Sequence, residues 1–127
     1  MIIKSGFAPV PGTQLYYEIS GSGPPIVFLH GNPLDLRMWD SQAEEFAEKY
    51  TVLRFDFRGF GRSGNQGPEG YSHAEDLKTM LEYLHIKHVH LVGLSMGGGA
   101  AVNFAILFPE MALSMTAVDS SLGGFKY

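Results

Sequence analysis

Ser95 stands at the centre of the pentapeptide Gly93-Leu-Ser-Met-Gly97, which has the form G-x-S-x-G. An apolar run precedes it and a helical pattern follows it, so we expect a sharp strand-to-helix turn that lifts the serine above the sheet. Glycines two residues to either side would avoid Cβ clashes with neighbouring backbone. Amides at the start of the following helix favour developing negative charge. Ser95 is therefore a candidate nucleophile, with the Met96 N–H as an oxyanion donor; the alternative is a Gly/Ser loop that begins a helix.

A second candidate segment is the H-G-N-P sequence that begins at His30, directly after an apolar run. Gly31 allows the backbone to turn so that an amide faces the nucleophile, and we expect the Asn32 N–H to be the second oxyanion donor. A histidine at a strand end usually hydrogen-bonds nearby backbone, so His30 is not expected to be the base. The residues expected to shape the site are His30, Gly31, Gly93 and Gly97.

The third motif, Asp56-Phe-Arg-Gly-Phe-Gly-Arg-Ser63, follows another apolar run. Asp56 is expected to accept local amides rather than take part in catalysis, and Arg58 can pair with a carboxylate. The remaining histidines lack ligand partners at metal-binding spacing, so no metal site is predicted. These histidines, expected to be surface or structural residues, are His73, His85, His88 and His90.

Apolar runs and helical periods alternate along the chain and predict the elements that position these motifs. The runs at 26–29, 52–55 and 89–92 are typical of strands buried on both faces of a parallel sheet, and a further strand is expected at 113–118. Helices are expected over 39–50, from the Ser72/Glu75 capping box onward, and over 96–108. Runs near 2–8 and 15–19 indicate an opening antiparallel hairpin. The fold class is therefore α/β, with a mostly parallel sheet.

The composition of the chain limits the classes of function to be considered. The 127 residues suit one domain, spanning 1–127, and their 45% hydrophobic content suits a packed core. The net charge of −4, without any run of Lys or Arg, argues against nucleic-acid or membrane partners. The chain has no cysteine and no evident leader or transmembrane segment, which favours a cytoplasmic location.

The three motifs, HGNP, DFRGFGRS and GLSMGG, resemble in their order and spacing the N-terminal half of an α/β hydrolase. Together with the segment Asp35-Leu-Arg-Met-Trp-Asp40, they are similar to the 3-oxoadipate enol-lactone hydrolases and carboxylesterases. The resemblance implies a serine ester or lactone hydrolase that works through an acyl-enzyme without metal or organic cofactor. Haloalkane dehalogenases share HGNP but carry an aspartate in the place of Ser95. Arg37 or Arg58 could orient a small carboxylate substrate.

The resemblance also implies groups that this chain does not supply. Family members place the catalytic acid and then the histidine after the nucleophile, yet no histidine follows Ser95. We therefore expect the C-terminal half and the cap over the site to be absent, and the base to come from a complementary C-terminal polypeptide. Asp119 is an alternative acid, although an aspartate that caps a turn is the favoured interpretation of this position. The competing hypothesis is a catalytically incomplete α/β module that associates with another copy through its exposed sheet edge.

Overall fold

A computed structural model describes residues 2–65 and 70–120. Within these residues lie six strands and three α-helices, with one short 3-10 helix, η1, before the first α-helix. The strands are β1 (Ile3–Val10), β2 (Thr13–Ser20), β3 (Pro25–Leu29), β4 (Thr51–Phe55), β5 (Val89–Leu94) and β6 (Ala112–Val118). The helical elements are η1 (Leu36–Trp39), α1 (Asp40–Phe46), α2 (His73–Tyr83) and α3 (Met96–Leu107). None of the described helices has the length and apolar character needed to cross a membrane.

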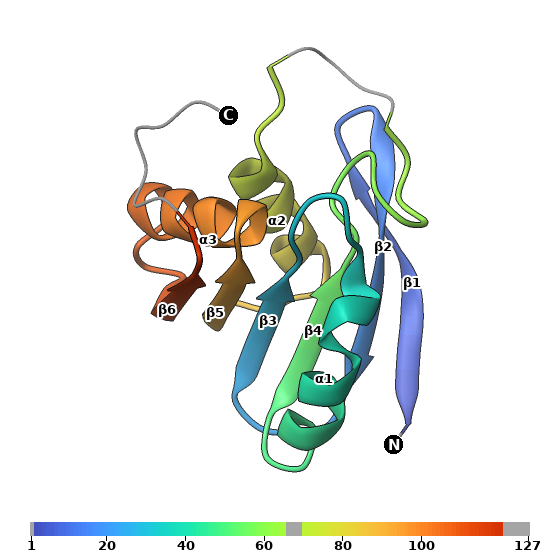
Figure 1. The fold of residues 1–127 in the computed structure, drawn as a ribbon, viewed down its shortest axis with the longest axis vertical. Coiled ribbons are helices and arrows are strands. Elements are labelled where there is room, and N and C mark those ends of the chain that lie inside the picture. Colours follow the sequence, from blue (N-terminus) through green and yellow to red (C-terminus); the bar gives the residue numbers. More distant parts are fainter. Residues whose placement is uncertain (1, 66–69, 121–127) are drawn as a thin grey trace.

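The strands form a single sheet in the order β1-β2-β4-β3-β5-β6 (Figure 1). The β1–β2 hairpin is antiparallel, and β2 is also antiparallel to β4. The pairs β3–β4, β3–β5 and β5–β6 are parallel. The predicted α/β class, with a mostly parallel sheet and an antiparallel N-terminal hairpin, is confirmed. Because β3 and β5 are parallel and adjacent, the loops that follow them lie together at the carboxyl ends of these strands.

Alternate residues of the central strands pack into two separate apolar clusters, one on each face of the sheet. Val27 and Leu29 of β3 belong to the cluster that includes the buried faces of α2 and α3. Ile26 and Phe28 belong to a smaller cluster with Trp39 and residues of α1. Two-residue alternation in β3 therefore fixes α1 on one face and the pair α2–α3 on the other.

The strand β5 departs from the predicted burial on both faces, and β6, at the edge of the sheet, is more exposed still. In β5, buried residues alternate with half-buried ones, so only its α3 side is fully covered. In β6 most side chains are exposed, and none is fully buried. The apolar run at 89–92 predicted burial of β5 on both faces, but among the described elements no helix covers the α1 side of β5 or of β6.

The first predicted helix is shorter than its periodicity indicated. It ends at Phe46, and the amides of Lys49 and Tyr50 both donate to the Phe46 carbonyl as the chain turns into β4. The start of α2 agrees with the predicted capping box, since the Ser72 Oγ accepts the Glu75 N–H at 3.3 Å.

A buried ion pair joins the loop after β4 to α2. The Arg58 Nε and Nη2 donate to the two carboxylate oxygens of Asp76 at 3.0 and 2.9 Å, and Nη1 donates to the Pro11 carbonyl at 2.8 Å. Both side chains are almost fully buried. The guanidinium therefore fixes three separate segments: the hairpin turn, the loop after β4 and α2.

Removing one charge of this pair should destabilise the fold strongly. Replacing Asp76 with Asn leaves the Arg58 charge buried without its counter-ion, and we expect a loss of about 3–5 kcal/mol of unfolding free energy. Urea unfolding followed by circular dichroism measures this loss. Glu75→Gln removes an exposed carboxylate from the neighbouring position and serves as the control. A loss below about 1 kcal/mol for Asp76→Asn would contradict this role.

Candidate active site

Ser95 occupies the sharp turn between β5 and α3. Its backbone has φ 54° and ψ −113°, a left-handed conformation that non-glycine residues rarely adopt. Its N–H donates to the Val118 carbonyl at 2.9 Å, which ties the turn to the end of β6. The hydroxyl makes no capping bond to α3, although serine commonly caps a helix with its side chain. In the described part of the chain, the Ser95 Oγ is thus not engaged in holding the helix.

The glycines on either side of Ser95 allow the backbone to pack without side chains between the segments. A methyl group on Gly97 would lie inside contact distance of the Leu29 carbonyl and 2.6 Å from the carbonyl oxygen of His30. One on Gly93 would collide with the Gly97 carbonyl and lie 2.7 Å from the Gly98 nitrogen. The start of α3 is therefore pressed against both β5 and the end of β3.

The H-G-N-P segment lies directly beside this turn. A Cβ built on Gly31 would stand 3.6 Å from the Ser95 Cβ. The Gly31 N–H donates to the Met38 Sδ at 3.4 Å, whereas among the described residues the Asn32 N–H has no hydrogen-bonding partner. The Met96 N–H is at the first position of α3, where helices leave their amides unsatisfied. Two unpartnered amides therefore flank the turn that holds Ser95.

A buried carboxylate connects the loops around this edge of the sheet. Asp56 accepts the Leu36 N–H at 2.8 Å and the Arg62 N–H at 2.9 Å through its two oxygens. The expected local contact, to Arg62, is present. The contact to η1, twenty residues away in sequence, has no sequence signal because it depends on how β3 and β4 are paired.

His30 is fully buried, and both of its ring nitrogens contact backbone groups. Its Nε2 accepts the Phe57 N–H at 3.0 Å, so Nδ1 carries the proton and donates to the Gly31 carbonyl at 2.9 Å. Burial lowers the pKa of this imidazole below its ordinary value of 6.5. His30 is therefore neutral and fully hydrogen-bonded, and it braces the turn at Gly31 rather than facing Ser95 with a free nitrogen.

The other four histidines lie away from Ser95 or are covered by other side chains. His73, at the start of α2, stacks on Phe57 with ring centroids 4.5 Å apart, and burial lowers its pKa as well. The Nδ1 atoms of His88 and His90 contact the Glu110 carbonyl and the Ser114 hydroxyl. No histidine ring in the described structure hydrogen-bonds to the Ser95 hydroxyl.

Of the two arginines expected to orient a substrate, neither points a free guanidinium at Ser95. The Arg58 guanidinium is buried in its ion pair with Asp76, and the substrate-binding role expected of Arg37 or Arg58 stays a prediction. Arg37 is exposed, but it forms a two-bond ion pair with Asp35 that lowers the pKa of that carboxyl to about 2.

Asp119 directly follows β6, whose last residue, Val118, accepts the Ser95 N–H, and it has a left-handed φ of 48°. Asp119 therefore lies at the carboxyl ends of the parallel strands, as Ser95 does.

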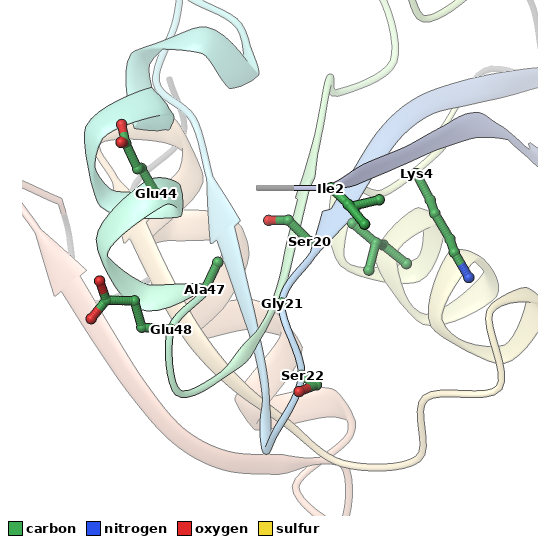
Figure 2. A pocket seen from close by; sticks show the side chains of 9 residues that line it. Ile2, Lys4, Ser20, Gly21, Ser22, Glu44, Ala47 and Glu48 are labelled. Carbon is green, nitrogen blue, oxygen red and sulfur yellow. The ribbon is translucent and has the colours of Figure 1, made fainter.

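A groove of about 650 Å³ lies at the opposite end of the sheet. Figure 2 shows Glu44 of α1 and Glu48, just after that helix, on one side of it and Ile2 and Lys4 on the other. Its charged side chains, Lys4, Glu44 and Glu48, are exposed and come from β1, from α1 and from the segment after α1. The groove contains no paired nucleophile and base, and in the described residues no cluster of histidine and acidic side chains could hold a metal ion. The candidate site therefore lies around Ser95, at the carboxyl ends of β3 and β5.

Comparisons with known proteins agree with this geometry. Residues 24–125 match the family described as the alpha/beta hydrolase fold. The chain is 34% identical over 108 residues to a putative carbamate hydrolase, RutD, of Azorhizobium caulinodans, covering 84% of this chain and 41% of that protein.

Two solved structures superpose on most of the chain. The epoxide hydrolase CorEH, solved without ligand, has a TM-score of 0.89 and 28% identity over 99% of this chain and 47% of its own. Est816, described as an N-acyl homoserine lactone degrading enzyme, has a TM-score of 0.85 and 33% identity over 91% of this chain and 45% of its own. The chain thus spans less than half the length of these relatives.

Two glycine substitutions in α3 test the close backbone packing around Ser95. Gly97→Ala forces a methyl group into the Leu29 and His30 carbonyls, so we expect a loss of about 3 kcal/mol or more. Gly99→Ala, two residues further along α3, meets nothing within 4 Å and should stabilise the helix by up to about 1 kcal/mol. Chemical denaturation measures both changes. Equal effects of the two substitutions would contradict the close backbone packing.

The buried histidines predict a loss of stability in acid. Because the folded-state pKa values of His30 and His73 lie below 6.5, the unfolded chain binds protons first as the pH falls. Each should lower the unfolding free energy below about pH 6.5, by up to about 1.4 kcal/mol per pH unit. Urea unfolding at a series of pH values measures this slope, which should be shallower in His30→Asn. His85→Asn, which removes an exposed imidazole, is the matched control; equal slopes for His30→Asn and wild type would refute the buried neutral state.

Proposed function

The chain belongs to the alpha/beta hydrolase fold family, and on that premise we propose that it carries the nucleophile of a serine hydrolase acting on carboxylic esters or lactones. The observation that carries this proposal is the strained turn at Ser95, whose hydroxyl is not used to cap α3. Strained backbone clusters at functional sites because the surrounding structure must maintain it at a cost of about 1–3 kcal/mol. Here the close packing of Gly93 and Gly97 maintains it.

The proposed chemistry is acyl transfer. A general base takes the Ser95 hydroxyl proton as Oγ attacks the carbonyl carbon of the ester, and it later gives this proton to the leaving oxygen. The carbonyl oxygen becomes an oxyanion held by the N–H groups of Met96 and Asn32. Collapse of this intermediate expels the alcohol, or opens the lactone ring, and leaves an acyl group on Ser95. Water then attacks the acyl-enzyme and releases the carboxylic acid. The unsatisfied amide at the start of α3 supports this role of Met96.

The residue at position 95 supports ester or lactone chemistry over dehalogenation. An aspartate at this position would attack an alkyl carbon, whereas a serine hydroxyl is suited to a carbonyl carbon. The likeness to Est816, which is described as degrading an acyl homoserine lactone, supports the lactone alternative. Arg37 is the more accessible candidate for contact with a substrate carboxylate, because it lies on the surface beside the H-G-N-P segment.

The acid and the base of the proposed mechanism come from outside the described residues. Because no histidine follows Ser95 and none of the five contacts it, we propose that a complementary C-terminal polypeptide supplies the imidazole. The solved relatives contain about as many residues again as this chain matches. Asp119 is the alternative acid within the chain, since it follows the strand that binds the Ser95 amide.

Covalent labelling with a fluorophosphonate tests the proposal. We expect the 127-residue chain to react slowly but selectively at Ser95, because the two amides and the helix start stabilise the anionic transition state without a general base. Peptide mass spectrometry identifies the labelled residue. Ser95→Ala should abolish labelling, whereas Ser114→Ala should not, although Ser114 is the serine whose hydroxyl contacts a histidine, at 2.7 Å.

Two outcomes would contradict the proposal. Labelling of Ser114, or of several serines at equal rates, would show that the Ser95 turn does not activate its hydroxyl. Ester hydrolysis should also exceed the uncatalysed rate by no more than about 10³–10⁴-fold, the range that an oxyanion hole and binding retain without a complete triad. Full enzymatic turnover by the pure chain would show that the base lies within these 127 residues.

A further inference from the structure

A methionine sulfur binds one of the backbone amides beside Ser95. The Gly31 N–H donates to the Met38 Sδ at 3.4 Å, across seven residues of sequence. Gly31 is buried and lies just past the end of β3, so its N–H is outside the hydrogen-bond ladder of the sheet. A buried amide needs a partner, and the thioether is the acceptor that meets this one.

The short helix η1 that carries Met38 is itself fixed on both sides. The Leu36 N–H donates to the buried Asp56 carboxylate at 2.8 Å. Trp39 is buried and packs on Phe28 with ring centroids 4.9 Å apart. Met38 lies between these two anchors along the chain and is half-buried against the same apolar cluster as Trp39. Its sulfur is therefore presented to the turn after β3 by a rigid segment.

Hydrogen bonds on both sides of Gly31 fix the direction of the Asn32 N–H. The Gly31 carbonyl accepts the His30 Nδ1–H at 2.9 Å and the Leu34 N–H at 2.8 Å. Within a trans peptide the C=O and N–H groups point in opposite directions, so these bonds turn the Asn32 N–H away from His30 and Leu34. The bond to Met38 fixes the preceding peptide as well. Glycine has the greatest backbone freedom, so the direction of the Asn32 N–H depends on anchoring both of these peptides.

From this arrangement we propose that Met38 is a positioning residue for the oxyanion site. Its sulfur holds the Gly31 N–H and thereby keeps the Asn32 N–H in the direction of Ser95. This role rests on the proposed function, since the direction of that amide matters for catalysis only where an oxyanion forms. Met38 acts through Gly31 and need not touch the substrate. It maintains a donor in one place before the substrate binds, which is the condition under which oxyanion donors are most effective.

Two substitutions at Met38 separate a hydrogen-bond acceptor from a side chain that only fills space. Leucine conserves the volume and the apolar character but cannot accept the Gly31 N–H. Glutamine has a similar length and restores an acceptor oxygen, but it packs less well among apolar groups. A side chain that only fills space would therefore tolerate Met38→Leu better than Met38→Gln. A positioning sulfur predicts the opposite order.

Met80→Leu is the matched control. It makes the same exchange of methionine for leucine in the fully buried core face of α2. Among the described residues, no amide donates to the Met80 sulfur. Circular dichroism and urea unfolding check that all three variants fold.

The rate of fluorophosphonate labelling at Ser95 is the first measurement. We expect Met38→Leu to lower this rate about tenfold or more, because an oxyanion donor that is displaced loses most of its effect. Met38→Gln should recover most of the lost rate, and Met80→Leu should be labelled at the wild-type rate. Equal rates for Met38→Leu and Met80→Leu, or a slower rate for Met38→Gln than for Met38→Leu, would overturn the positioning role.

Hydrogen exchange of the Gly31 amide, followed by NMR, tests the contact without relying on any reaction of Ser95. The Gly31 N–H should exchange about fivefold faster in Met38→Leu than in the wild type, the effect of losing one net hydrogen bond, and Met38→Gln should reverse this change. Unchanged exchange in Met38→Leu would overturn the role whatever the labelling shows. Absence of labelling at Ser95 in the wild type, with the expected exchange rates, would contradict the proposed function and leave Met38 as the anchor of the turn.

Discussion

The contact of Gly97 with the carbonyls of Leu29 and His30 is the constraint on which the geometry around Ser95 depends. Backbone meets backbone there without an intervening side chain, so α3 begins at a fixed place against the ends of β3 and β5. That contact holds Ser95 in a left-handed conformation and places the segment after β3 beside it. The proposed nucleophile and both proposed oxyanion donors therefore lie on segments that main-chain packing holds in place.

Buried polar groups secure the loops around this constraint. His30 joins two backbone segments through its two ring nitrogens, and Asp56 joins η1 to the loop after β4. Arg58 and Asp76 tie the same loop to α2. Loops carry many unpaired backbone groups, and satisfying them from buried side chains makes these segments rigid. A preorganised site benefits from this rigidity, because oxyanion donors act best when they do not have to move.

The two faces of the sheet differ in how completely they are covered. On one face α2 and α3 bury the central strands, while on the other α1 covers β3 and β4 and leaves β5 and β6 partly exposed. The uncovered region adjoins the Ser95 turn, because the last residue of β6 accepts the Ser95 amide.

The sequence by itself determined the strands, the α2 and α3 helices, the fold class and the Ser95 turn, because apolar periodicity and glycine spacing are local signals. It did not determine the end of α1, the burial of β5 and β6, or the partner of Arg58. Those depend on which segments meet in space: Arg58 reaches Asp76 and Pro11, 18 and 47 residues away. The approach of Gly31 to Ser95 likewise required the register of β3 against β5, which only the tertiary structure fixes.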